Sequence, residues 1–148
     1  MESAIKRVGV IGIGHLGQHH ARVYTELLDA RLVGIVDRDE ERAHLIGENL
    51  GVPAYSTMEE LIVRQAPDAV SIVVPTSLHF DVARAAMEAG IYVLVEKPVT
   101  TRPDEAEELL KLAAKKNPEP PENGSPALCA TSRSCSFSPQ TLKMTDRK

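Results

Sequence analysis

The chain has 148 residues, with 17 basic and 21 acidic side chains and a formal net charge of −4. This balance argues against a protein that binds nucleic acid through its phosphates, and an aromatic content of 3% argues against a platform for base stacking. No apolar run is long enough to cross a membrane, and the N-terminus has no signal-peptide core. We therefore expect a cytoplasmic protein that binds neither nucleic acid nor membranes.

Short aliphatic runs alternate with amphipathic stretches along the first 117 residues. The runs are continuous, as in strands that are buried on both faces of a parallel sheet. Strands are expected at residues 7–11, 32–36, 69–74 and 92–95, with a weaker one at 54–55. Helices are expected at residues 16–27, 40–50 and 78–89, in a short segment after Thr57, and around 106–113. This alternation predicts an α/β fold with a doubly wound parallel sheet of the Rossmann type, in the strand order 3-2-1-4-5.

The composition changes near residue 117. Residues 118–148 hold five of the ten prolines and few large apolar side chains, too few to offset the entropy lost on ordering. We therefore expect a dinucleotide-binding domain at 1–117 and a disordered, unrelated tail at 118–148. A complete sheet of this kind has a sixth strand, expected near residue 120, but prolines there remove ladder donors. The last strand is therefore expected to be missing.

A glycine-rich motif, G-x-G-x-x-G, lies between the first expected strand and the first expected helix. It consists of Gly12, Ile13, Gly14, His15, Leu16 and Gly17. In a dinucleotide-binding loop the first glycine permits a tight turn, the second lets the backbone approach a pyrophosphate, and the third lets the helix pack closely. The alternative is a glycine-rich turn that serves packing alone.

An acidic residue, Asp37, follows the second expected strand, 20 residues after Gly17. A carboxylate at this place accepts hydrogen bonds from the adenosine ribose and repels a 2′-phosphate, which favours NAD. The adjacent Arg38 can stack on adenine or pair with a 2′-phosphate, so NADP remains possible. The alternative is a strand-end aspartate that starts a turn or caps the next helix, an interpretation that fits Asp39 better.

The ends of the fourth and fifth strands carry further candidates. Val74, Pro75 and Thr76 are expected to lie along the cofactor, with His79 nearby; the alternative is a plain strand-to-helix turn. At the end of the fifth strand, Glu96 and Lys97 precede a proline. Lys97 is a candidate to polarise or protonate a substrate oxygen, and the alternative is a surface ion pair.

No metal site is expected. His15, His19 and His20 have helical spacing, but no carboxylate or cysteine accompanies them in a zinc-binding pattern. Cys129 and Cys135 match neither a standard metal spacing nor a disulfide scaffold.

Taken together, residues 5–117 resemble the N-terminal domain of the Gfo/Idh/MocA oxidoreductase family. The resemblance rests on VGVIGIGHLGQHHARVY, LVGIVDRD, PDAVSIVVPTSLHFDVARAAMEAG and YVLVEKPVTTRPDEAEELL. It implies a nicotinamide-dependent dehydrogenase that oxidises a secondary hydroxyl of a sugar, cyclitol or nucleotide-linked sugar. Within it, Lys97 matches the active-site lysine, Glu96 a cofactor-ribose contact and Asp37 the adenosine-ribose carboxylate. Pro75, Thr76 and His79 match the motif after the fourth strand.

The family pattern continues with a sixth strand and a second domain that holds the sugar pocket, and this sequence offers neither. The resemblance therefore implies a truncated, cofactor-binding domain that is inactive alone and takes a sugar substrate only when a second domain is supplied. The alternative is a non-catalytic nucleotide-binding or interaction module, so whether the chain is itself an enzyme stays open.

Overall fold

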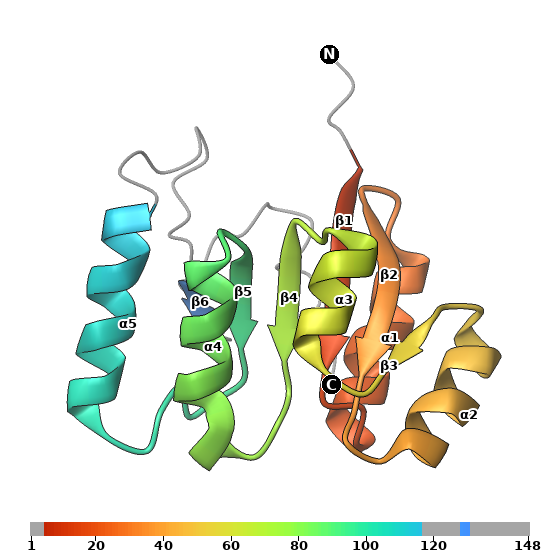
Figure 1. Ribbon diagram of the computed structural model, residues 1–148, viewed down its shortest axis with the longest axis horizontal. Coiled ribbons are helices and arrows are strands. Elements are labelled where there is room, and N and C mark those ends of the chain that lie inside the picture. Colours follow the sequence, from red (N-terminus) through yellow and green to blue (C-terminus); the bar gives the residue numbers. More distant parts are fainter. Residues whose placement is uncertain (1–4, 117–127, 131–148) are drawn as a thin grey trace. The chain divides into compact units, whose positions relative to one another are not determined.

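The computed structural model describes residues 5–116 and 128–130. Parallel strands alternate with helices along the chain, and the strand order is β3-β2-β1-β4-β5-β6 (Figure 1). The α/β fold class and the order 3-2-1-4-5 that the sequence predicts are confirmed. The chain divides into two compact units, residues 1–74 and 75–148.

The first unit holds four strands and three helices. In chain order these are β1 (Lys6–Ile11), α1 (His15–Glu26), β2 (Ala30–Val36), α2 (Glu40–Leu50), β3 (Ala54–Tyr55), α3 (Met58–Gln65) and β4 (Ala69–Ile72). β1 lies between β2 and β4 and pairs in parallel with both, while β3 pairs with the outer side of β2. The fourth strand ends two residues earlier than the sequence predicts, so Val74 lies in the connection that follows it.

Helices cover both faces of these four strands, with α3 in front and α1 behind in Figure 1. On the α3 side, the fully buried Leu61 lies over two glycines, Gly9 of β1 and Gly34 of β2. A Cβ atom at these glycines would lie only 2.5 and 2.7 Å from the Leu61 side chain. On the other side, the Tyr24 hydroxyl of α1 and the Ser71 hydroxyl of β4 share a buried hydrogen bond of 2.7 Å. Small residues and one polar bond therefore fix both helices closely on the strands.

The second unit begins with a short 3₁₀ turn, η1 (Thr76–Leu78), and continues with α4 (His79–Glu88), β5 (Tyr92–Val95), α5 (Pro103–Lys116) and β6 (Leu128–Ala130). The two long helices pack side by side. Arg84 of α4 pairs with Glu108 of α5 at 3.4 Å, and the Lys116 ammonium donates to the Glu88 carbonyl at 3.3 Å.

The structure corrects the expectation that the last strand is missing. β6 pairs in parallel with β5, with Leu128 opposite Val93 and Ala130 opposite Val95. The prolines on which the expectation rested all precede residue 127, so residues 128–130 keep all their backbone donors. The disorder predicted for 118–148 otherwise concerns residues outside the described ones.

None of the helices in the described part of the chain has the length and apolar character that a bilayer crossing requires.

Candidate functional site

The glycine loop between β1 and α1 is tight, and its glycines serve different purposes. Gly12 has φ +89°, and a Cβ atom there would meet the Val73 carbonyl. A Cβ atom on Gly17 would collide with the Gly12 carbonyl oxygen, so the first turn of α1 lies directly on the loop. Gly14 is the N-cap residue of α1, and no atom of the described residues lies within 4 Å of a Cβ built on it. Gly14 therefore leaves open the side from which a ligand would approach.

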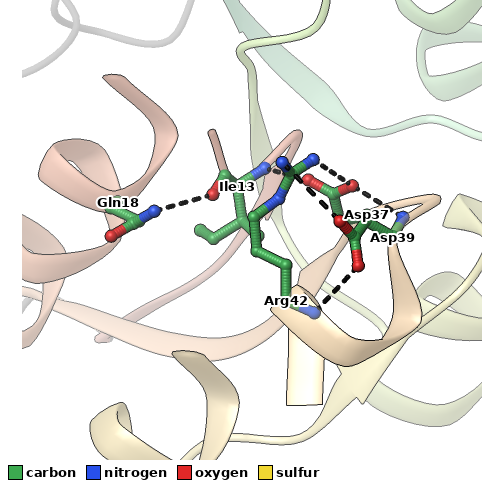
Figure 2. Close-up of polar contacts among 5 residues, drawn as sticks. All are labelled: Ile13, Gln18, Asp37, Asp39 and Arg42. Carbon is green, nitrogen blue, oxygen red and sulfur yellow. Dashed lines mark hydrogen bonds and ion pairs between the residues drawn. The ribbon is translucent and has the colours of Figure 1, made fainter. Parts of the chain in front are cut away.

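The backbone N–H and the backbone carbonyl of Ile13, at the centre of this loop, both make hydrogen bonds to side chains (Figure 2). Its N–H donates to Oδ2 of Asp37 at 2.8 Å, and its carbonyl accepts from the Gln18 side chain at 3.2 Å. The Ile13 side chain is fully buried. The loop conformation is therefore fixed by groups of the protein itself.

The N-terminus of α1 has the properties of an anion-binding site. The first N–H groups of a helix lack helical partners, and the helix dipole places partial positive charge there. The first turn of α1 carries no acidic side chain, and Gly14 offers no side-chain cap. His15 and Leu16 are exposed there, and the His15 ring contacts the His19 ring edge-on at a centroid distance of 4.8 Å. A pyrophosphate fits helix amides that lack helical partners beside a glycine N-cap.

The Asp37 carboxylate, at the end of β2, is buried and accepts three hydrogen bonds. Besides the Ile13 amide, the Asp39 amide donates at 2.9 Å and the Arg42 guanidinium at 2.8 Å, both to Oδ1 (Figure 2). Burial alone would raise the pKa of Asp37, but the hydrogen bonds from Arg42, Asp39 and Ile13 hold it below its ordinary value. The carboxylate is therefore ionised at neutral pH and joins the glycine loop to the start of α2.

Arg42 is the partner that the sequence interpretation missed. It lies on the first turn of α2, five residues after Asp37. A basic residue in the first turn after a strand-end carboxylate is the signal that would have found it. Asp39 caps α2 by accepting from the Arg42 amide at 3.0 Å, as the capping interpretation expected. Arg38 is exposed.

In the second unit, His79 is buried and reaches the loop after β5. Its Nδ1 lies 2.8 Å from the Pro98 carbonyl oxygen. Because a carbonyl can only accept, Nδ1 carries the proton and donates. His79 therefore ties the start of α4 to the segment that contains Lys97. Neither Thr76 nor Ser77 caps α4 through its side chain.

Glu96 and Lys97 follow β5 directly. Glu96 is half-buried, and Lys97 is exposed, as are Pro75 and Pro98. The second unit on its own therefore leaves the Lys97 ammonium in water.

The structure thus brings the glycine loop, Asp37 and Arg38 together within the first unit, with Val74 at its end. Thr76, His79, Glu96 and Lys97 belong to the second unit. Within residues 5–116 and 128–130, no three histidine, cysteine or acidic side chains gather in a way that would hold a metal ion.

Comparisons with known proteins place these features in a family. Residues 6–118 match the Gfo/Idh/MocA family, described as an oxidoreductase family with an NAD-binding Rossmann fold. The UDP-N-acetylglucosamine 3-dehydrogenase of Acidithiobacillus ferrooxidans is 42% identical over 111 residues, which are 75% of this chain and 34% of that protein. Its solved structure superposes with a TM-score of 0.71 over 76% of this chain and 36% of that one.

Two further relatives differ in the cofactor that their names give. The D-xylose 1-dehydrogenase (NADP(+)) 2 of Haloferax volcanii is 37% identical over 66% of this chain and 30% of its own length. GenD2 from gentamicin A biosynthesis, solved in complex with NAD, has a TM-score of 0.78 at 25% identity, over 95% of this chain and 38% of that one. The chain spans about a third of the length of the curated relatives. It belongs to the Gfo/Idh/MocA family of oxidoreductases and carries that family's NAD-binding Rossmann domain.

Proposed function

We propose that this chain is the cofactor-binding domain of an NAD(P)-dependent dehydrogenase that oxidises a secondary hydroxyl of a sugar or nucleotide-linked sugar. The observation that carries the proposal is the hydrogen bond between the Ile13 amide and Asp37. It joins the glycine loop, at the free N-terminus of α1, to the acidic end of β2. These are the two features that bind the pyrophosphate and the adenosine ribose of a dinucleotide.

On the cofactor side, each part has a role that follows from its chemistry. The first amides of α1 would hold the pyrophosphate, since they carry the partial positive charge of the helix N-terminus and Gly14 leaves space beside them. Asp37 would accept a ribose hydroxyl, because one lone pair of Oδ2 is left after its three hydrogen bonds. Arg38 would stack on adenine. Val74, Pro75, Thr76 and His79 would line the path toward the nicotinamide, and Glu96 would bind its ribose.

On the substrate side, Lys97 would contact the hydroxyl that reacts. When bound, the nicotinamide supplies the hydride acceptor. As the carbinol C–H bond breaks and the carbonyl forms, the hydroxyl proton must leave, and Lys97 would accept or share it. Its exposure in this chain means that the surroundings that would desolvate it must come from elsewhere. The name of the relative that acts on UDP-N-acetylglucosamine supports a nucleotide-linked sugar as the substrate class.

Titration with dinucleotides tests the cofactor part. NADH should bind and NADPH should bind more weakly, because the buried carboxylate of Asp37 lies where a 2′-phosphate would enter. Asp37→Ala should narrow or reverse this difference. Equal dissociation constants for both cofactors in the unaltered chain would contradict the preference.

A non-catalytic nucleotide-binding module would bind the same cofactors, so turnover after fusion to the substrate domain of a relative separates the two functions. We expect the chain to bind a sugar substrate only together with a substrate domain. We expect it to bind neither nucleic acid nor membranes. Its cytoplasmic location stays a prediction that cell fractionation would test.

A further inference from the structure

The charge of Asp37 is compensated from the neighbouring helix. Nη2 of Arg42 donates to Oδ1 of Asp37 at 2.8 Å, and Nη1 lies 3.8 Å from the Asp39 carboxylate. Only 7% of the Asp37 side chain is exposed, against 45% of the Arg42 side chain. The acidic end of β2 therefore presents to a ligand an ion pair whose cation is the accessible member.

This pairing changes what a 2′-phosphate would meet. A lone carboxylate would repel the phosphate, and the Arg42 guanidinium at hydrogen-bond distance offsets the charge of Asp37. With the Asp39 carboxylate 3.8 Å from the same guanidinium, two negative charges and one positive charge meet here, so the repulsion is reduced and not abolished. The same donors hold the pKa of Asp37 below its ordinary value, against the effect of burial. Asp37, which disfavours NADP, and Arg42, which offsets its charge, thus form one ion pair.

The position of the second arginine narrows the choice. Arg38 is adjacent to Asp37 in sequence and exposed, but in the described part of the chain the ion pair of Asp37 is made by Arg42. Arg38 therefore leaves the charge of Asp37 uncompensated and can act on adenine, which NAD and NADP share. Arg42 acts at the point where the two cofactors differ.

We propose that Arg42 is a specificity-determining residue, which narrows the preference for NAD over NADP by offsetting the charge of Asp37. This inference rests on the proposed function and deepens it. In this mechanism the ion pair between Arg42 and Asp37 sets the size of the preference, and Arg42 need not contact the 2′-phosphate directly.

The test measures dissociation constants of NADH and NADPH at low ionic strength, by nicotinamide fluorescence, for the whole chain. Arg42→Gln should weaken NADPH binding about tenfold and change NADH binding less than about threefold, as expected when one charge-assisted interaction is exposed to repulsion. Arg42→Lys keeps the positive charge and should keep most of the NADPH affinity. Arg38→Gln should affect both cofactors alike. Arg22→Gln, an exposed change of equal charge on α1, is the matched control.

A double variant separates charge compensation from direct contact and guards against misfolding. Asp37→Asn with Arg42→Gln removes both charges at nearly constant shape. The dissociation constant of NADPH divided by that of NADH should then return to within about threefold of its value in the unaltered chain. If NADPH still binds as weakly relative to NADH in the double variant as in Arg42→Gln, the proposal is overturned in favour of direct contact between Arg42 and the phosphate. Equal weakening of both cofactors by Arg42→Gln, or a shift in ratio caused by Arg38→Gln alone, would also overturn it. If the unaltered chain bound neither dinucleotide, the proposed function itself would fail. Binding of both with a ratio insensitive to Arg42 would overturn only this inference.

Discussion

At the scale of single residues, Asp37 links two segments that helix α1 and strand β2 separate along the chain. Its carboxylate holds the glycine loop through the Ile13 amide and the first turn of α2 through Asp39 and Arg42. The same hydrogen bonds keep its pKa below the ordinary value, against the effect of burial. Structure and ionisation are therefore coupled at this residue.

That coupling predicts an acid-sensitive contribution to stability. Because the pKa of Asp37 is lower in the folded chain than its ordinary 3.8, the unfolded chain takes up the proton first as the pH falls. The stabilisation is complete well above pH 3.8 and is lost as the pH falls through the folded-state pKa. In urea unfolding, Asp37→Asn should lower the free energy of unfolding by about 2 kcal/mol at neutral pH. The difference between the two proteins should shrink toward pH 3. A difference that stayed constant with pH would show that the charge contributes nothing.

His79, the first residue of α4, holds the loop that follows β5. Its proton on Nδ1 is donated to the Pro98 carbonyl next to Lys97. His79→Leu should lower the free energy of unfolding by about 1–3 kcal/mol, since it leaves that carbonyl without its donor. His79→Asn, whose amide nitrogen reaches about as far as Nδ1, should recover part of the loss. Chemical unfolding of the three proteins measures this, and equal losses for Leu and Asn would argue against the hydrogen bond.

At the scale of elements, the glycine loop and α1 act together, and two of its glycines can be separated by experiment. Gly17→Ala places a Cβ atom against the Gly12 carbonyl and should cost about 1–3 kcal/mol of stability. Gly14→Ala meets no atom of the described residues and loses only a favourable N-cap residue, so its free energy of unfolding should fall by less than about 1 kcal/mol. Its NADH affinity should nevertheless fall clearly, because a methyl group then stands where the pyrophosphate approaches. Thermal unfolding and NADH titration distinguish the two effects. Normal NADH binding by Gly14→Ala would show that the ligand does not enter from this side.

The elements that the sequence predicts well are those whose pattern is local. Continuous aliphatic runs predict the strands, and Thr57 predicts the start of α3. The Thr57 hydroxyl oxygen accepts from the Glu60 amide at 3.3 Å. β6 was missed because three residues after a proline-rich stretch carry no pattern of their own, and only pairing with β5 makes them a strand. Its formation is a tertiary effect that periodicity does not encode.

The candidate site divides in the same way. The glycine spacing and Asp37 are readable because each needs a particular residue type at a fixed distance from a strand. The partner of Asp37 was not, since Arg38 and Arg42 are equally basic and only the geometry of α2 brings one guanidinium within 2.8 Å. The buried position of His79 was likewise hidden, because its acceptor lies 19 residues away on a loop.

At the scale of the whole molecule, the chain spans about a third of its curated relatives. Positioning of substrate against cofactor can supply roughly 7–11 kcal/mol of a barrier, and an exposed Lys97 cannot supply it alone. We therefore expect this chain to bind NADH and to show no measurable oxidation of free or nucleotide-linked sugars. Sugar-dependent formation of NADH by the 148-residue chain, followed at the nicotinamide absorbance band, would contradict this.

A chimera tests the role of Lys97. Joining residues 1–116 to the remaining part of the UDP-N-acetylglucosamine 3-dehydrogenase should restore turnover, and Lys97→Ala in that chimera should remove most of kcat, about 10²-fold or more. The matched control is Lys111→Ala, a helix α5 residue outside the proposed site. Full activity of the Lys97→Ala chimera would reduce Lys97 to a strand-end surface residue.

The two hydrogen bonds of the Ile13 backbone also affect how fast a ligand binds. A loop that is already held by Asp37 and Gln18 has little conformational entropy left to lose when a dinucleotide arrives. Association should then follow a single exponential whose rate rises linearly with cofactor concentration, without the plateau that a slow loop rearrangement would impose. Disrupting the Gln18 contact, as in Gln18→Ala, should loosen the loop, lower the association rate and introduce that plateau.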